Sequence, residues 1–267
     1  MASNSQLLTN VDRMRPGFLI AALVAALATA SCGSDDVARD DAAPPDVTVF
    51  AAASLTAAFT ELGAAFTAAT PGAEVTFSFA GSSELVAQLR EGAPAGVFAS
   101  ADLANMAVLT DADLVDGEPE VFATNAAAII VEAGNPRGVT GVADLANDDL
   151  VVVQCAPEVP CGAYAEQVYA NAGVTVMPSS LEQNVKAVAT KVLLGEADAG
   201  LVYRTDVLEA GDGADGVTIP DDVNVVAEYP IALVADAPAP LGGRAFIDFV
   251  LSAAGQRILV DHGFGPA

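Results

Sequence analysis

The segment "VTVFAAASLTAAFTEL", residues 47–62, joins two kinds of pattern without a loop between them. It begins with a short apolar run that is typical of a buried strand. From Leu55 onward, apolar side chains recur at steps of three and four residues, as they do on one face of a helix. Ser54 stands at the junction, where the pattern predicts the N-cap of that helix. The segment therefore predicts a strand followed directly by a helix, which is the repeating unit of α/β folds.

The same unit recurs along the chain. The predicted strands are residues 47–51, 73–80, 95–102, 126–132, 150–154, 174–176 and 199–203, and a long extended stretch at 223–236. The predicted helices pass through Phe59, Leu85, Met106, Val168, Val188 and Phe249. This alternation indicates an α/β fold with mainly parallel sheets. Because the units form two series joined by extended stretches, we expect two lobes, residues 47–123 plus 230–267 and residues 124–229, with the ligand site in the cleft between them.

The first 31 residues differ in composition from the rest of the chain. Two arginines precede the apolar run "GFLIAALVAALATA" (residues 17–30), and small residues follow it, which predicts a signal peptide over residues 1–31. Cys32 lies where bacterial lipoproteins carry their lipidated cysteine, although Thr29 stands where leucine is favoured; an ordinary signal peptide or an uncleaved anchor are the alternatives. We expect lipidation at Cys32, a polar tether over residues 32–46, and a membrane-anchored protein on the extracytoplasmic face.

Charge and motif content exclude several classes of function. The chain has 10 Lys and Arg against 35 Asp and Glu, a formal net charge of -25, which argues against nucleic acid or an anionic membrane surface as the partner. It has a single histidine, His262, near the C-terminus, and it lacks the phosphate-loop, dinucleotide-binding and H-E-x-x-H motifs. We therefore expect no enzyme, no catalytic residues and no cofactor.

Two cysteines, Cys155 and Cys161, remain after the export segment. An exported chain enters an oxidising compartment, where a disulfide that closes this short loop would be stable. Sequence separation does not show whether the two side chains face each other. A disulfide and two free thiols therefore both remain open.

Small or hydroxyl residues occupy three predicted strand-to-helix turns: Ser54, the "GSS" turn at residues 81–83, and the "PCG" turn at residues 160–162. The N–H groups of a helix's first turn lack intrahelical acceptors, and the helix dipole favours negative charge there. Several such turns together would bind an anion without a cationic side chain. The simpler alternative is that Ser54 and Ser82 cap their own helices.

Five segments of the sequence are similar to one known family. They are "VTVFAAASL", "SFAGSSELVAQLREGAPAGVFASAD", "VPCGAYA", "NVKAVATKVLLGEADAGLVY" and the terminal stretch from "EYPIAL" to "GQRILVDHGF". In this order they resemble the periplasmic molybdate-binding proteins, the substrate-binding component of molybdate ABC transporters. The resemblance implies a two-lobe, type II periplasmic-binding-protein-like fold, each lobe a mainly parallel sheet flanked by helices. It also implies capture of molybdate or tungstate by a monomer, for delivery to the membrane permease of an ABC importer.

The resemblance also implies which residues bind the oxyanion. They are Ser54 and Ser82 through hydroxyl and backbone N–H groups, Cys161 and Val185 through backbone N–H groups, and Tyr203 through its phenol. No bare metal cation is expected, because molybdenum would be bound as its oxyanion. Neutral donors suit a fully ionised tetrahedral dianion, whereas hydrogen phosphate would favour a carboxylate acceptor for its proton. Glu84 would repel a dianion, so we expect it to face solvent; binding of sulfate or phosphate on the same fold remains the alternative, and an enzyme on a two-lobe α/β scaffold is a weaker one.

Overall fold

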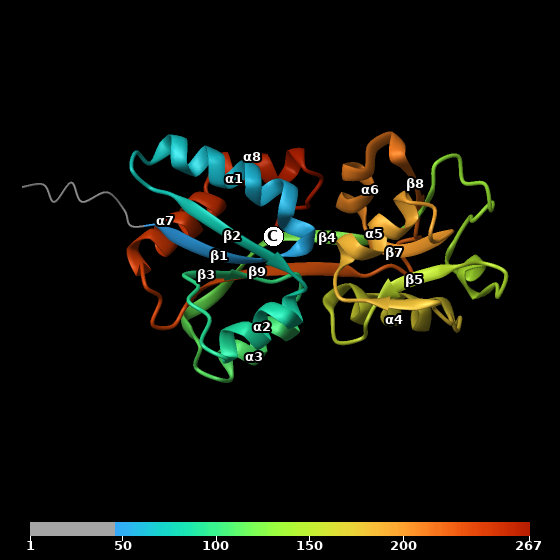
Figure 1. Cartoon of the computed structure of the whole chain (residues 1–267), viewed down its shortest axis with the longest axis horizontal. Helices are drawn as coiled ribbons and strands as arrows, with labels where there is room; N and C mark the ends of the chain where they lie inside the picture. Colours follow the sequence, from blue (N-terminus) through green and yellow to red (C-terminus); the bar gives the residue numbers. More distant parts are fainter. Residues whose placement is uncertain (1–45) are drawn as a thin grey trace, which may run out of the picture. The chain divides into compact units, whose positions relative to one another are not determined.

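Residues 46–267 are described by the computed structural model, in which helices cover a mixed sheet on both sides (Figure 1). The predicted signal peptide, the predicted lipidation site Cys32 and the tether up to residue 45 lie outside the described residues. Over residues 46–267, no helix has both the length and the apolar character needed to cross a membrane.

A first group of elements is built on three parallel strands in the order β2-β1-β3. Its strands are β1 (Val47–Ala52), β2 (Val75–Ala80) and β3 (Val97–Ala99). Its helices are α1 (Thr56–Ala69), α2 (Ser82–Arg90), α3 (Leu103–Thr110), α7 (Pro240–Leu251) and α8 (Ala253–Asp261). Helices α1, α7 and α8 lie on one side of these strands, and α2 and α3 lie on the other (Figure 1).

A second group is built on the parallel strands β6-β5-β7. Its strands are β5 (Val152–Cys155), β6 (Ser180–Glu182), β7 (Ala199–Tyr203) and β8 (Ala214–Thr218). Its helices are α4 (Pro160–Ala172), α5 (Val185–Leu193) and α6 (Arg204–Ala210), with the short turns η2 (Val142–Ala146) and η3 (Gly211–Gly213). Helix α4 covers one face of the strands, while α5 covers the other.

Two long strands, β4 (Val115–Glu132) and β9 (Val226–Val234), run between the two groups (Figure 1). The first part of β4 pairs with β9, and its last residues, from Ala127, pair with β7 and β8. The predicted α/β class is confirmed, but the sheet is more mixed than predicted. Four of the eight strand pairings are antiparallel, and all four involve β4 or β9, because these strands return the chain from one group to the other.

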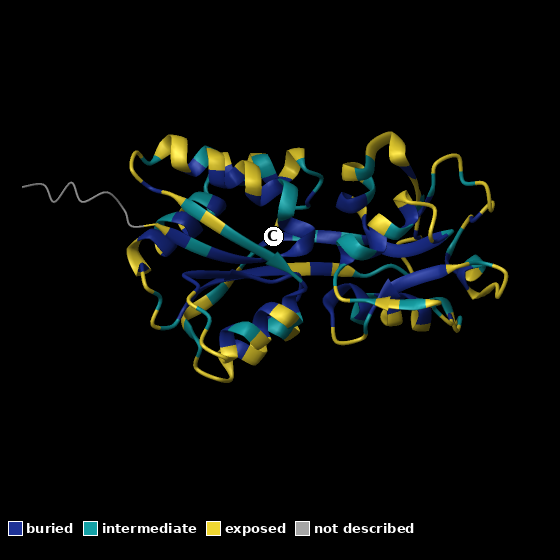
Figure 2. Cartoon of the chain, viewed as in Figure 1, coloured by how far each residue is buried: buried dark blue, intermediate teal, exposed yellow. Residues whose placement is uncertain are grey.

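The helical face predicted from the opening segment is confirmed. Leu55 and the α1 side chains Phe59, Leu62 and Phe66 are buried. The Phe59 ring lies 5.6 Å from that of Phe122 and 6.0 Å from that of Phe246, measured between centroids. Each such side chain contributes about 1.5–3 kcal/mol through burial. Figure 2 shows that much of the central strands is buried, whereas exposed residues lie on the outer faces of helices and in loops.

The strand predicted at residues 174–176 is wrong. Helix α4 ends at Gly173, whose φ of 66° turns the chain, and the N–H of Val174 donates to the carbonyl of Tyr169. Val174 and Val176 instead pack against a buried cluster beside α4. The strand that pairs with β5 is β6, which begins at Ser180. The alternation of apolar residues identified side chains that pack against the core, but they do so from a loop and not from a strand of the sheet.

Candidate functional site

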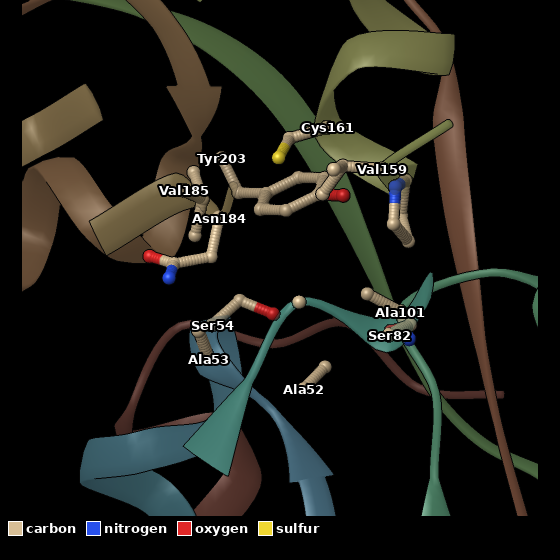
Figure 3. Close-up of a pocket in the computed structure, with 12 residues that line it drawn as sticks. Ala52, Ala53, Ser54, Ser82, Ala101, Val159, Cys161, Asn184, Val185 and Tyr203 are labelled. Atoms are coloured by element: carbon tan, nitrogen blue, oxygen red, sulfur yellow. Dashed lines mark hydrogen bonds between the residues drawn. The ribbon is translucent and has the colours of Figure 1, made fainter. Parts of the chain in front are cut away.

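Residues from both groups of elements surround one small cavity (Figure 3). Its lining consists of Ala52, Ala53, Ser54, Gly81, Ser82, Ala101, Val159, Pro160, Cys161, Asn184, Val185 and Tyr203. The cavity has a volume of about 10 Å³. This is close to the space that one ordered water needs. In this conformation the cavity therefore has room for about one water molecule, and a larger solute would need its walls to move apart.

The five residues proposed from the sequence, Ser54, Ser82, Cys161, Val185 and Tyr203, all line this cavity. Ser54 and Ser82 lie on one side of it, and Cys161, Val185 and Tyr203 lie on the other (Figure 3).

Ala101 and Asn184 also line the cavity and were not proposed from the sequence. Asn184 is the N-cap of α5, where its side chain accepts a hydrogen bond from Ala187 N at 3.0 Å. An asparagine directly before a helical pattern is a signal that could have identified this N-cap.

Three helices begin at the cavity. Their N-cap residues are Gly81 for α2, Val159 for α4 and Asn184 for α5, and all three line it. The first N–H groups of each helix have no intrahelical acceptor, and the partial positive charge of three helix ends adds at this point. The backbone therefore supplies an electropositive, donor-rich environment without a cationic side chain.

The predicted N-cap role of Ser54 is wrong. A 3₁₀ turn, η1 (Ala53–Leu55), intervenes between β1 and α1, and Leu55 is the N-cap of α1, without a side-chain hydrogen bond. The Ser54 hydroxyl instead lies 3.0 Å from the hydroxyl of Tyr229, a fully buried residue of β9. Ser54 is therefore held by a contact with a residue far away in the chain.

Ser82 does not cap its helix either. It is the first residue of α2, and Gly81 is the N-cap. The Ser82 oxygen accepts a hydrogen bond from Ala101 N at 3.1 Å. Since that bond uses a lone pair, the Ser82 hydrogen remains available to donate. The simpler alternative of two capping serines is thus excluded by the geometry.

The Tyr203 hydroxyl is a buried donor without a partner. Tyr203 is 2% exposed, and its hydroxyl has no hydrogen-bond partner among the described residues. Burial, reinforced by the neighbouring phenols of Tyr229 and Tyr164, holds the pKa of Tyr203 well above its usual value, so the phenol keeps its proton. An unpaired buried hydroxyl costs about 1–3 kcal/mol. A solute that accepts its hydrogen bond would remove this cost.

Among residues 46–267, no charged side chain lines the cavity. The ammonium of Lys186, next to Val185, is bonded to Asp206 Oδ1 at 2.9 Å and to Glu209. Glu84 is exposed, as expected, and His262 pairs with Glu61 at 2.8 Å away from the cavity lining. Within residues 46–267, no group of histidine, cysteine or carboxylate side chains is arranged to hold a metal ion.

Cys155 and Cys161 form a disulfide with a Cα–Cα distance of 5.6 Å. It ties the last residue of β5 to the first turn of α4, where the Cys161 N–H is one of the proposed donors. The adjacent Gly162 is equally constrained, because a Cβ there would lie 2.0 Å from the carbonyl oxygen of Ala156. The start of α4 is therefore fixed by a covalent bond and by close backbone packing.

Replacing both Cys155 and Cys161 with serine is expected to lower the free energy of unfolding by about 2–3 kcal/mol, because the short loop is no longer closed in the unfolded chain. Denaturant titration measures the change. Reducing the parent protein should reproduce it. A parent whose unfolding midpoint is insensitive to reductant would contradict the prediction.

A cavity enclosed between two groups of α/β elements is a common place for a small-molecule binding site. Residues 47–265 match the family model of the bacterial extracellular solute-binding proteins, and the chain belongs to that family. It is 44% identical over 252 residues to the molybdate-binding protein ModA of Mycobacterium tuberculosis, which covers 93% of this chain and 96% of that protein. The chain is thus an extracytoplasmic binding protein and not an enzyme.

Solved structures agree on the fold. The periplasmic molybdate-binding protein of Azotobacter vinelandii has a TM-score of 0.71 at 18% identity, covering 83% of this chain and 99% of that one. The sulfate-binding protein SubI from Mycobacterium tuberculosis has a TM-score of 0.77 at 19% identity, covering 84% and 87%. The predicted periplasmic-binding-protein-like fold is confirmed.

Proposed function

We propose that this protein captures molybdate outside the cytoplasm and delivers it to the membrane permease of an ABC importer, with tungstate as an alternative ligand. The observation that carries the proposal is the buried hydroxyl of Tyr203, which has no hydrogen-bond partner among the described residues and faces a cavity that none of their charged side chains lines. The name of the relative with 44% identity, a molybdate-binding protein, supports the choice of anion.

The chemistry of the lining suits this ligand. A fully ionised tetrahedral dianion accepts hydrogen bonds at every oxygen and donates none, so a lining of donors matches all of its oxygens. We propose that the hydroxyls of Ser54, Ser82 and Tyr203 and the backbone N–H groups of Cys161 and Val185 form this set. Hydrogen phosphate would need an acceptor for its proton, and none of the carboxylates in residues 46–267 lines the cavity. Sulfate has the same charge and shape as molybdate, so its rejection would rest on size.

The two groups of elements would act as two lobes, residues 47–123 plus 230–267 and residues 124–229. Strands β4 and β9 are the connections between them, and bending of these strands would open and close the cavity. A closed form around the anion would present the surface that the permease recognises. We also propose that residues 1–31 are a signal peptide, that Cys32 carries a lipid, that residues 32–46 are a tether, and that the protein acts as a monomer.

Calorimetric titration of residues 33–267 with molybdate, tungstate, sulfate and phosphate tests the proposal. Molybdate and tungstate are expected to bind tightly, sulfate more weakly, and phosphate least. A stronger signal with sulfate would assign the protein to the sulfate binders, and the absence of any molybdate signal would reject the proposed ligand.

Oxyanion affinity is expected to be nearly independent of pH between about 6 and 9, a range in which a histidine or an ordinary thiol would titrate. The cavity cysteine is in a disulfide, and the pKa of Tyr203 is raised, so neither group changes charge there. Titrations at several pH values measure this. A clear loss of affinity on crossing neutral pH would show that a titrating group takes part in binding.

A further inference from the structure

The two groups of elements approach each other closely at Gly81. This residue is the N-cap of α2, in the first group. A Cβ placed on it would lie 2.3 Å from the backbone carbonyl oxygen of Gln183 and 3.5 Å from Val159 Cγ1, both in the second group. A contact of 2.3 Å lies far inside van der Waals distance. The backbone of Gln183 therefore occupies the space that any side chain at position 81 would need.

The local conformation of Gly81 does not itself require glycine. Its φ of -60° and ψ of 140° lie in the extended region that any residue adopts. Helix N-caps are most often serine, threonine, asparagine or aspartate, which would stabilise α2 further. Within the first group alone, a side chain at position 81 is thus acceptable. The need for glycine arises only from the approach of the second group.

We infer that the missing side chain of Gly81 is what allows the two lobes to close far enough to enclose the ligand. This inference rests on the proposed function and assigns a positioning role to a residue that offers no donor side chain. Ser82, the next residue, reaches the cavity from the first lobe, while Val185 lies two residues after Gln183 in the second. The contact between Gly81 and Gln183 therefore sets the separation of donors that must meet on one small anion.

A side chain at position 81 would hold the lobes apart. The atom that it meets is a backbone oxygen, which cannot rotate away as a flexible side chain could. The closed form would then be less populated, and the apparent affinity falls in proportion to the population of the binding-competent form. The open form and the separate folding of each lobe should be unaffected.

The test uses Gly81→Ala and Gly81→Ser, with Gly141→Ala as the matched control. Gly141 has an extended φ of -178°, and a Cβ there meets nothing within 4 Å. Both Gly81 variants are expected to bind the oxyanion at least about tenfold more weakly, because they share the Cβ. Their unfolding midpoints without ligand should equal or exceed that of the parent, because alanine and serine restrict the unfolded chain and serine can cap α2.

Small-angle scattering gives a second measurement that is independent of affinity. The parent and Gly141→Ala should become more compact on adding molybdate, whereas the Gly81 variants should show a smaller change. If both Gly81 variants bind and compact as the parent does, the inference is wrong. If neither variant folds, it is also wrong, because the local conformation would then have required glycine. If the parent binds none of the four oxyanions, the proposed function fails and this inference fails with it.

Discussion

Replacing Tyr203 with phenylalanine is expected to weaken oxyanion binding without destabilising the protein. The phenol is the one cavity hydroxyl with no partner in the described part of the chain, so a bound oxyanion would be its first acceptor. A hydrogen bond to a charged group contributes about 1.5–3 kcal/mol, which corresponds to about a ten- to hundredfold loss of affinity. Since the variant also removes an unpaired buried hydroxyl, its free energy of unfolding without ligand should stay constant or rise.

Tyr169→Phe is a matched control for this prediction. The Tyr169 hydroxyl is also buried without a partner among the described residues, but Tyr169 does not line the cavity. Both variants should therefore be at least as stable as the parent in denaturant titrations, and only Tyr203→Phe should lose affinity in calorimetry. Equal affinities of the two variants would remove Tyr203 from the site.

Local patterns were sufficient to predict much of this molecule. The step from strand to helix at residues 47–62 follows from the periodicity of apolar side chains, which records which face of each element is buried. The positions of Ser54 and Ser82 at the ends of strands likewise follow from local pattern. Because the carboxyl ends of parallel strands lie on the same edge of a sheet, residues that follow them are brought near one another.

Contacts between distant residues account for what the sequence could not show. The hydrogen bond between the hydroxyls of Ser54 and Tyr229 joins residues 175 positions apart, so the local sequence pattern around either residue does not predict it. The start of β4 at Val115 was missed because its first part is polar and contains Gly117, whose φ of 84° interrupts the ladder between Asp116 and Glu120. The close approach at Gly81 is set by the packing of two groups, whereas the sequence shows only a glycine before a helix.

The hydroxyl of Ser54 connects the cavity to a strand that joins the two groups. Tyr229 lies on β9 beside Ala123 of β4, within the segment where both strands pass between the groups. Its ring packs edge-on against Tyr203 and Phe122, at centroid distances of 6.0 Å and 6.3 Å. Two of the proposed ligand residues therefore contact the same buried tyrosine.

Combining Ser54→Ala with Ser82→Ala is expected to reduce oxyanion affinity by about 150-fold or more, because two hydrogen bonds to a charged ligand contribute about 3 kcal/mol together even at the lower limit. Stability should also fall, by about 1–3 kcal/mol for each site, because Tyr229 loses its hydroxyl partner and the N–H of Ala101 loses its acceptor. This distinguishes the serines from Tyr203, because Tyr203→Phe should weaken binding without lowering stability.

Ser83→Ala is the control, since Ser83 shares the first turn of α2 with Ser82 but does not line the cavity. Calorimetry and denaturant titration of the three proteins measure both effects, and a double variant that still binds molybdate as tightly as the parent would show that the donors lie elsewhere.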